Sequence, residues 1–143
     1  MKRKLRSVFF VASFLLAIGS FIVYYFWRNR IEYEIPGDYR GWIIVQYGNG
    51  ACEALRDTGA FRVIRVPSSG RACTSDAHPD RWTYYKFEYV YPNGSRKALP
   101  WNEHGKTGIQ AWLTGYRIED QSEEIFVGDE QAMNHSGTPP ASR

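Results

Sequence analysis

An uncharged stretch of 20 residues, from Val8 to Trp27, constrains the fold of this chain more than any other sequence feature. As a helix rising about 1.5 Å per residue, it would be roughly 30 Å long, which matches the hydrocarbon thickness of a bilayer. Tyr24, Tyr25 and Trp27 lie at its far end, where amphipathic rings favour the membrane interface. The sequence therefore predicts one transmembrane helix over residues 8–27.

The charges that flank this stretch predict its orientation. Four basic residues precede it, two follow it (Arg28 and Arg30), and the first 30 residues contain no acid. Because the more basic flank stays in the cytoplasm, we expect residues 1–7 to be cytoplasmic and the rest of the chain to lie outside.

A cleaved signal peptide is the alternative interpretation of this stretch. Ala17 and Gly19 have the small side chains that cleavage after Gly19 would need. Cleavage would leave a long apolar N-terminus beginning at Ser20, so the sequence favours a retained signal-anchor. No cysteine lies near the end of the stretch, which excludes a lipid-modified cysteine there.

The remaining 143 − 30 = 113 residues have the size of one small domain. They hold 12 basic and 15 acidic residues, a balance of 12 − 15 = −3, although the whole chain carries +3. The basic excess therefore belongs to membrane targeting, and we expect no nucleic-acid partner.

Beyond Arg30 the apolar residues alternate with a period of two, which is typical of strands. Asn93 and Gly94 favour a tight hairpin turn between two of the expected strands. The pattern predicts a mainly β domain, a small β-sandwich or barrel-like fold, over residues 31–130. A short helix and a disordered polar tail (135–143) should follow it. The expected strands cover residues 31–35, 39–47, 61–66, 82–91, 95–99, 109–114 and 124–127.

The two cysteines, Cys52 and Cys73, are expected to form a disulfide if the domain lies outside the cytoplasm. The closed loop of 22 residues would contribute roughly 3 kcal/mol to stability. A reactive thiol is the alternative, but it would need a nearby base or a Cys-x-x-Cys spacing, and the sequence shows neither.

Few residues suggest chemistry. Glu103 and His104 lie beside Lys106 and could act as an acid–base pair if this segment is a loop. No nucleophile elbow, phosphate-binding glycine loop or zinc motif is present, so neither cofactor nor metal is expected. Trp82, Trp101 and Trp112 could form a platform for a sugar or peptide, with ordinary core packing as the alternative.

Seven segments stand out in their order and spacing: residues 35–42, 47–49, 63–67, 69–75, 89–94, 99–100 and 126–130. Together they resemble a bacterial family of small extracytoplasmic domains of unknown function. Members of that family follow a signal peptide, a lipid anchor or a membrane helix. The resemblance therefore implies location and fold, and it transfers no catalytic residue.

These observations predict a single-pass bacterial envelope protein, anchored in the lipid bilayer through residues 8–27. Its β-rich domain would be a non-catalytic binding or interaction module for an envelope protein or glycan. A small envelope hydrolase that uses Glu103 and His104 is the first alternative. A structural subunit that dimerises through small residues of its helix is the second.

Overall fold

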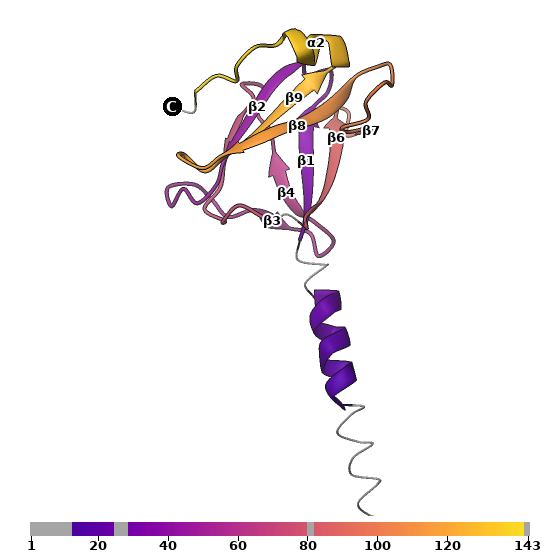
Figure 1. Ribbon diagram of the computed structural model, residues 1–143, viewed down its shortest axis with the longest axis vertical. Coiled ribbons are helices and arrows are strands. Elements are labelled where there is room, and N and C mark those ends of the chain that lie inside the picture. Colours follow the sequence, from indigo (N-terminus) through magenta and orange to yellow (C-terminus); the bar gives the residue numbers. More distant parts are fainter. Residues whose placement is uncertain (1–12, 25–28, 80–81, 142–143) are drawn as a thin grey trace, which may run out of the picture.

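The computed structural model describes residues 13–24, 29–79 and 82–141. Residues 13–24 form a helix that lies outside the β-rich domain (Figure 1). Among these described residues, no helix is both long enough and apolar enough to cross a bilayer.

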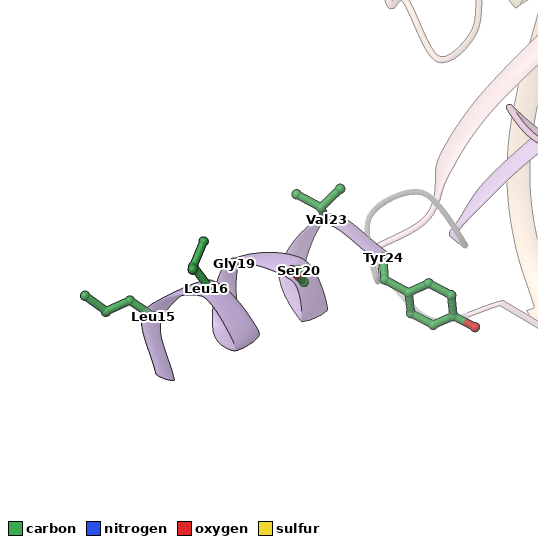
Figure 2. A pocket seen from close by; sticks show the side chains of 6 residues that line it. All are labelled: Leu15, Leu16, Gly19, Ser20, Val23 and Tyr24. Carbon is green, nitrogen blue, oxygen red and sulfur yellow. The ribbon is translucent and has the colours of Figure 1, made fainter. Parts of the chain in front are cut away.

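The ends of the predicted membrane span, residues 8–12 and 25–27, lie outside the described part of the chain, as does the predicted cytoplasmic segment 1–7. The large apolar side chains of the helical segment are exposed. Figure 2 shows six of its residues along a hollow that this helix alone lines: Leu15, Leu16, Gly19, Ser20, Val23 and Tyr24.

The described part of the domain is mainly β, as predicted, with its strands in two sheets and one short C-terminal helix. The elements are β1 (Arg30–Pro36), β2 (Gly41–Gln46), β3 (Arg56–Asp57), β4 (Arg62–Arg65), β5 (Arg71–Cys73), β6 (Tyr84–Val90), β7 (Arg96–Leu99), β8 (Gln110–Arg117), β9 (Ser122–Gly128) and α2 (Glu130–His135).

The first sheet has the order β3-β4-β1-β6-β7, with β1 at its centre. Both neighbours of β1 run parallel to it, whereas the two outer strands are antiparallel to their partners. Alternation along β1 buries Ile31, Tyr33 and Ile35 in the core and directs Glu32 and Glu34 to the opposite face.

The second sheet has the order β5-β2-β9-β8. Strands β8 and β9 form a hairpin with a bulge between Leu113 and Gly115. Strand β5 pairs parallel to β2, so both sheets combine parallel and antiparallel neighbours. Side chains from both sheets meet in one core, for example Tyr33 and Phe87 from the first and Ile43 and Ile125 from the second.

The predicted hairpin around Asn93 is confirmed, because β6 and β7 pair antiparallel on either side of it. Gly94 donates its N–H to the Tyr91 carbonyl at 2.9 Å and adopts a φ of 81°. Only the glycine of the Asn–Gly pair therefore uses a positive φ.

The disulfide between Cys52 and Cys73 is present, as predicted, and the described residues include no free cysteine. The loop that it closes contains β3, β4 and most of β5. The disulfide thus joins the loop between β2 and β3 to β5, an edge strand of the second sheet.

Three features of the sheets differ from the sequence prediction. Strands β3 and β5 were not expected, because they are short and their residues are mostly polar and exposed. The β8–β9 hairpin is longer than the two expected strands, since polar residues continue its ladder to the Arg117–Ser122 pair. Strand β2 begins only at Gly41, because a turn with Asp38 at a φ of 63° occupies the preceding residues.

Candidate functional site

The outer face of the first sheet carries carboxylates that are almost buried. Glu32 and Glu34 project from the central strand β1 and are only 6% and 7% exposed. Long basic side chains from the other strands of this sheet form ion pairs with them. The sheet therefore presents a layer of cations above a row of anions.

Glu34 is the centre of this arrangement. Arg65 Nε lies 2.9 Å from one carboxylate oxygen, and Arg56 Nη2 lies 3.3 Å from the other, which Arg96 also contacts. Burial alone would raise the pKa of Glu34, but hydrogen bonds from Arg96 and Arg65 outweigh burial and hold this pKa below its usual value.

A second ionic cluster continues along β6. Lys86 Nζ lies 3.0 Å from Glu32 and 2.9 Å from Glu88, and Arg96 Nη1 lies 3.1 Å from each of these carboxylates. Burial would raise the pKa of Glu88, and hydrogen bonds led by that from Lys86 lower it. Arg96 joins the two clusters because it contacts all three carboxylates.

A groove of about 520 Å³ opens beside Glu34. We call it the arginine groove and define it by Glu34, Arg56, Arg65 and Arg96, which line it together with apolar and backbone groups near Pro36 and Tyr91. Arg96 is shared with Glu32 and Glu88, which Lys86 also contacts, so the connected network around the groove holds four cations and three carboxylates, a balance of 4 − 3 = +1.

Two guanidinium groups of the arginine groove have N–H donors that do not contact Glu34. Arg65 uses Nε for Glu34, and its side chain is 70% exposed, so its two terminal nitrogens face solvent. Arg56 likewise uses one nitrogen for Glu34 while half of its side chain is exposed. A guanidinium pair of this kind can donate to the oxygens of a carboxylate or phosphate.

A separate cluster, which we call the inner cluster, lies inside the domain around Glu123 of β9. Tyr85 and Tyr47 donate their hydroxyls to its carboxylate at 2.8 and 3.1 Å, and Tyr33 donates to it as well. His78 Nε2 lies 3.5 Å from the same carboxylate. Burial, followed by the charge of Glu123, raises the pKa of each of the three tyrosines.

This inner cluster joins the two sheets, because two of the tyrosines lie on the first sheet and Glu123 lies on the second. Glu123 is 2% exposed and Tyr33 is fully buried. A ligand cannot reach these groups in the folded domain, so their arrangement indicates a structural role.

The residues of the predicted acid–base pair have separate partners. Glu103 forms an ion pair with Lys106 at 2.6 Å, whereas His104 Nδ1 lies 3.1 Å from Glu130 of α2. The Gly105 N–H donates to the other oxygen of Glu130 at 2.9 Å, which fixes this loop against the helix. Glu103 and His104 thus stabilise the loop, and no contact between their side chains is found.

The three tryptophans of the predicted platform lie in different environments. Trp112 is buried in β8 and donates its indole N–H to the Gly128 carbonyl at 3.0 Å. Trp101 packs against Tyr85 and Phe87, and Trp82 is exposed just before β6. Burial removes Trp112 from any surface platform and leaves two tryptophans for it.

The arginine groove was missed by the sequence interpretation. Its signal is the alternation of Glu32 and Glu34 with apolar residues, together with charged residues on the outer positions of the strands that contain Arg65 and Lys86. That signal becomes a site only when both strands pair with β1, and sequence periodicity does not reveal which strands are neighbours. The described residues contain no group of three or more His, Cys, Asp or Glu side chains that could hold a metal ion.

The fold and its surface define a small two-sheet β domain with a cationic groove. The model of a "Family of unknown function (DUF6843)" matches residues 28–136, and the chain belongs to this family. This match covers nearly the whole domain, and it confirms the predicted resemblance to a family of unknown function. A search of curated proteins gives no match to the chain.

One solved structure is similar to this fold, a crystal structure described as "Putative Lipoprotein from Bacillus anthracis". It is 22% identical in sequence, with a TM-score of 0.54, and the alignment covers 80% of this chain and 82% of that chain. At this level of identity the comparison shows a shared fold.

Proposed function

We propose that this chain is a membrane-anchored, extracytoplasmic protein of a bacterial envelope whose β domain is a non-catalytic binding module. Its arginine groove binds an anionic group of an envelope glycan or protein. The observation that carries the proposal is the convergence of three partly exposed arginines on one nearly buried carboxylate.

The anchor is supported by sequence and by exposure. The 20-residue uncharged stretch has the length of a membrane span, and the described helix inside it exposes large apolar residues such as Phe14, Leu16 and Phe21. The similar Bacillus anthracis protein is described as a "Putative Lipoprotein", which agrees with an anchored domain outside the cytoplasm. The disulfide agrees with an oxidising compartment.

The groove is supported by its contrast with the rest of the domain. Residues 31–143 carry a net charge of −3, whereas the connected ionic network around the arginine groove carries 4 − 3 = +1. Buried Glu34 orients the three guanidinium groups before a ligand arrives, so less side-chain entropy is lost on binding. An anionic oxygen would therefore find oriented donors in an otherwise acidic domain.

Location is tested with a membrane-impermeant maleimide on intact cells. We expect Cys52 and Cys73 to react only after reduction, because both are joined in the disulfide and both lie outside the membrane. Labelling that appears only after cell lysis, without reductant, would contradict this topology.

Binding is tested with the full chain in nanodiscs of zwitterionic lipid. The probe is a fluorescent, soluble peptidoglycan fragment that carries free carboxylates. R65Q should weaken binding about tenfold, the loss of roughly one charge-assisted hydrogen bond. R56Q/R65Q should abolish most of it, and added salt should weaken the wild type.

The matched control is K97Q, which removes one exposed positive charge from β7 outside the arginine groove. It should leave binding nearly unchanged. Equal weakening by R65Q and K97Q would show that only overall charge matters. Absence of measurable binding by the wild type would contradict a groove that recognises anionic glycan.

A further inference from the structure

Two large aromatic side chains are exposed at one end of the first sheet. Trp82 is 73% exposed and lies two residues before β6, and Tyr84, the first residue of β6, is 60% exposed. The ring of Phe61 lies 6.1 Å from that of Tyr84. We call these three residues the aromatic rim.

The aromatic rim surrounds the point where the chain enters the domain. Tyr84 lies opposite Arg30 in the β1–β6 register, and its N–H donates to the Asn29 carbonyl at 2.9 Å. Arg30 is the first residue of β1, so the rim lies beside the connection to the apolar helix.

The end of that helix lies at the same end of the domain. Tyr24 lines a hollow of about 420 Å³ together with Phe61, Arg62 and Leu55. Six Cα–Cα steps separate Tyr24 from Arg30, which limits their separation to about 20 Å even in a fully extended chain. The rim is therefore held close to the end of the helix.

We propose that the aromatic rim inserts into the headgroup region of the bilayer that holds the helix. This inference rests on the proposed membrane anchor. Tryptophan and tyrosine favour that region because their rings are apolar at one side and form hydrogen bonds at the other. Arg30, at the same end, suits the phosphate groups of lipids. The rim thereby sets the orientation of the domain on the membrane and leaves the outer face of the first sheet accessible.

The test uses the full chain in vesicles of phosphatidylcholine with bromine on the acyl chains, at either a shallow or a deep position. Bromine quenches tryptophan fluorescence over short distances. We expect shallow bromine to quench the wild type more than W82F, so that the variant loses a shallow component.

A matched control moves the tryptophan to the opposite end of the domain. Ser68 is exposed beyond the carboxyl end of β4, which runs parallel to β1. In W82F/S68W the added tryptophan should not be quenched by either lipid. Quenching of this tryptophan, or equal quenching of the wild type and W82F, would contradict insertion of the aromatic rim.

Trp27 separates failure of the rim from failure of the anchor. It belongs to the predicted membrane span, so W27F should lose a component of quenching whether or not the rim inserts. A component that depends on Trp27 but none that depends on Trp82 would overturn the rim and leave the anchor standing. Absence of both components would overturn the rim together with the anchor.

Discussion

The outer face of the first sheet and the core between the two sheets bury carboxylates in different ways. On the outer face, Glu34 is 7% exposed and three guanidinium groups surround it. Inside the domain, Glu123 is 2% exposed and three tyrosine hydroxyls donate to it, with His78 nearby. The degree of burial is similar, but only the outer carboxylate has exposed, charged partners.

This difference distinguishes the arginine groove, a proposed binding surface, from the inner cluster, which links the two sheets. Long basic side chains can bury an anion and still present donors to solvent, because their charged ends remain exposed. Tyrosine hydroxyls that satisfy a carboxylate in the core have no further access to solvent. A nearly buried charge is therefore informative about function only when its partners are considered.

Removing the inner carboxylate should have the largest effect on stability. E123A would leave three hydroxyls in the core without their acceptor, and we expect a loss of about 3–5 kcal/mol in the free energy of unfolding. E34A should cost only about 1 kcal/mol, because water can solvate the exposed guanidinium groups. Equal losses of unfolding free energy for E123A and E34A in chemical denaturation would contradict the distinction between the inner and the outer carboxylate.

Removing the disulfide should have the next largest effect. C52S/C73S would release the loop that contains β3 and β4, with an expected loss of about 3 kcal/mol. Because these strands supply Arg56 and Arg65, binding at the arginine groove should weaken as well. Retained binding in the folded variant, measured with the same peptidoglycan fragment, would show that the groove does not need the disulfide.

The stability that the outer-face carboxylates contribute should be lost in acid, and the stability that the inner cluster contributes should be lost in alkali. The pKa values of Glu34 and Glu88 are lowered in the folded state, so their stabilising contribution is present at neutral pH and is lost as acid protonates them below about pH 4.5. The pKa values of Tyr33 and Tyr47 are raised, so their contribution is lost as the unfolded chain ionises above about pH 10.

Denaturant unfolding across the pH range measures both limits. E34Q should flatten the acidic limb and leave the alkaline limb unchanged, whereas Y47F should do the reverse. A variant that alters both limbs equally would show that the two clusters are coupled through the sheet.

The smallest effect on stability is expected for R65Q. Arg65 is mostly exposed and shares Glu34 with two other arginines, so its loss should cost at most about 0.5 kcal/mol. The same substitution should weaken binding about tenfold, as proposed above. A thermal melt beside the binding curve checks both, and a large loss of stability would make Arg65 a structural residue.

Local sequence patterns predicted the mainly β class, the β6–β7 hairpin and the disulfide. The alternation around Tyr33 and Phe87 is strong because one side of each strand faces the core. The order of strands was not predictable in this way, since β1 pairs with strands more than 25 and 50 positions away in the sequence.

The same limit explains why the candidate sites differed from expectation. Sequence reasoning paired Glu103 with His104 because they are adjacent. In the fold, His104 contacts Glu130 of α2, and Glu103 forms an ion pair with Lys106 of the same loop. The arginine groove combines residues from β1, β3, β4 and β7. A site assembled from so many strands leaves no continuous motif.

The central position of β1 has a mechanical consequence for an anchored domain. A force applied to the helix would be transmitted to the domain through Arg30 and would act along β1. Ladders to β4 and to β6 flank β1, with four and seven register pairs, and both partners run parallel to it. Such a load shears both ladders together, whereas unzipping would break their hydrogen bonds one after another. Extraction of β1, the strand that follows the helix, would thus require the hydrogen bonds of two ladders to break at once.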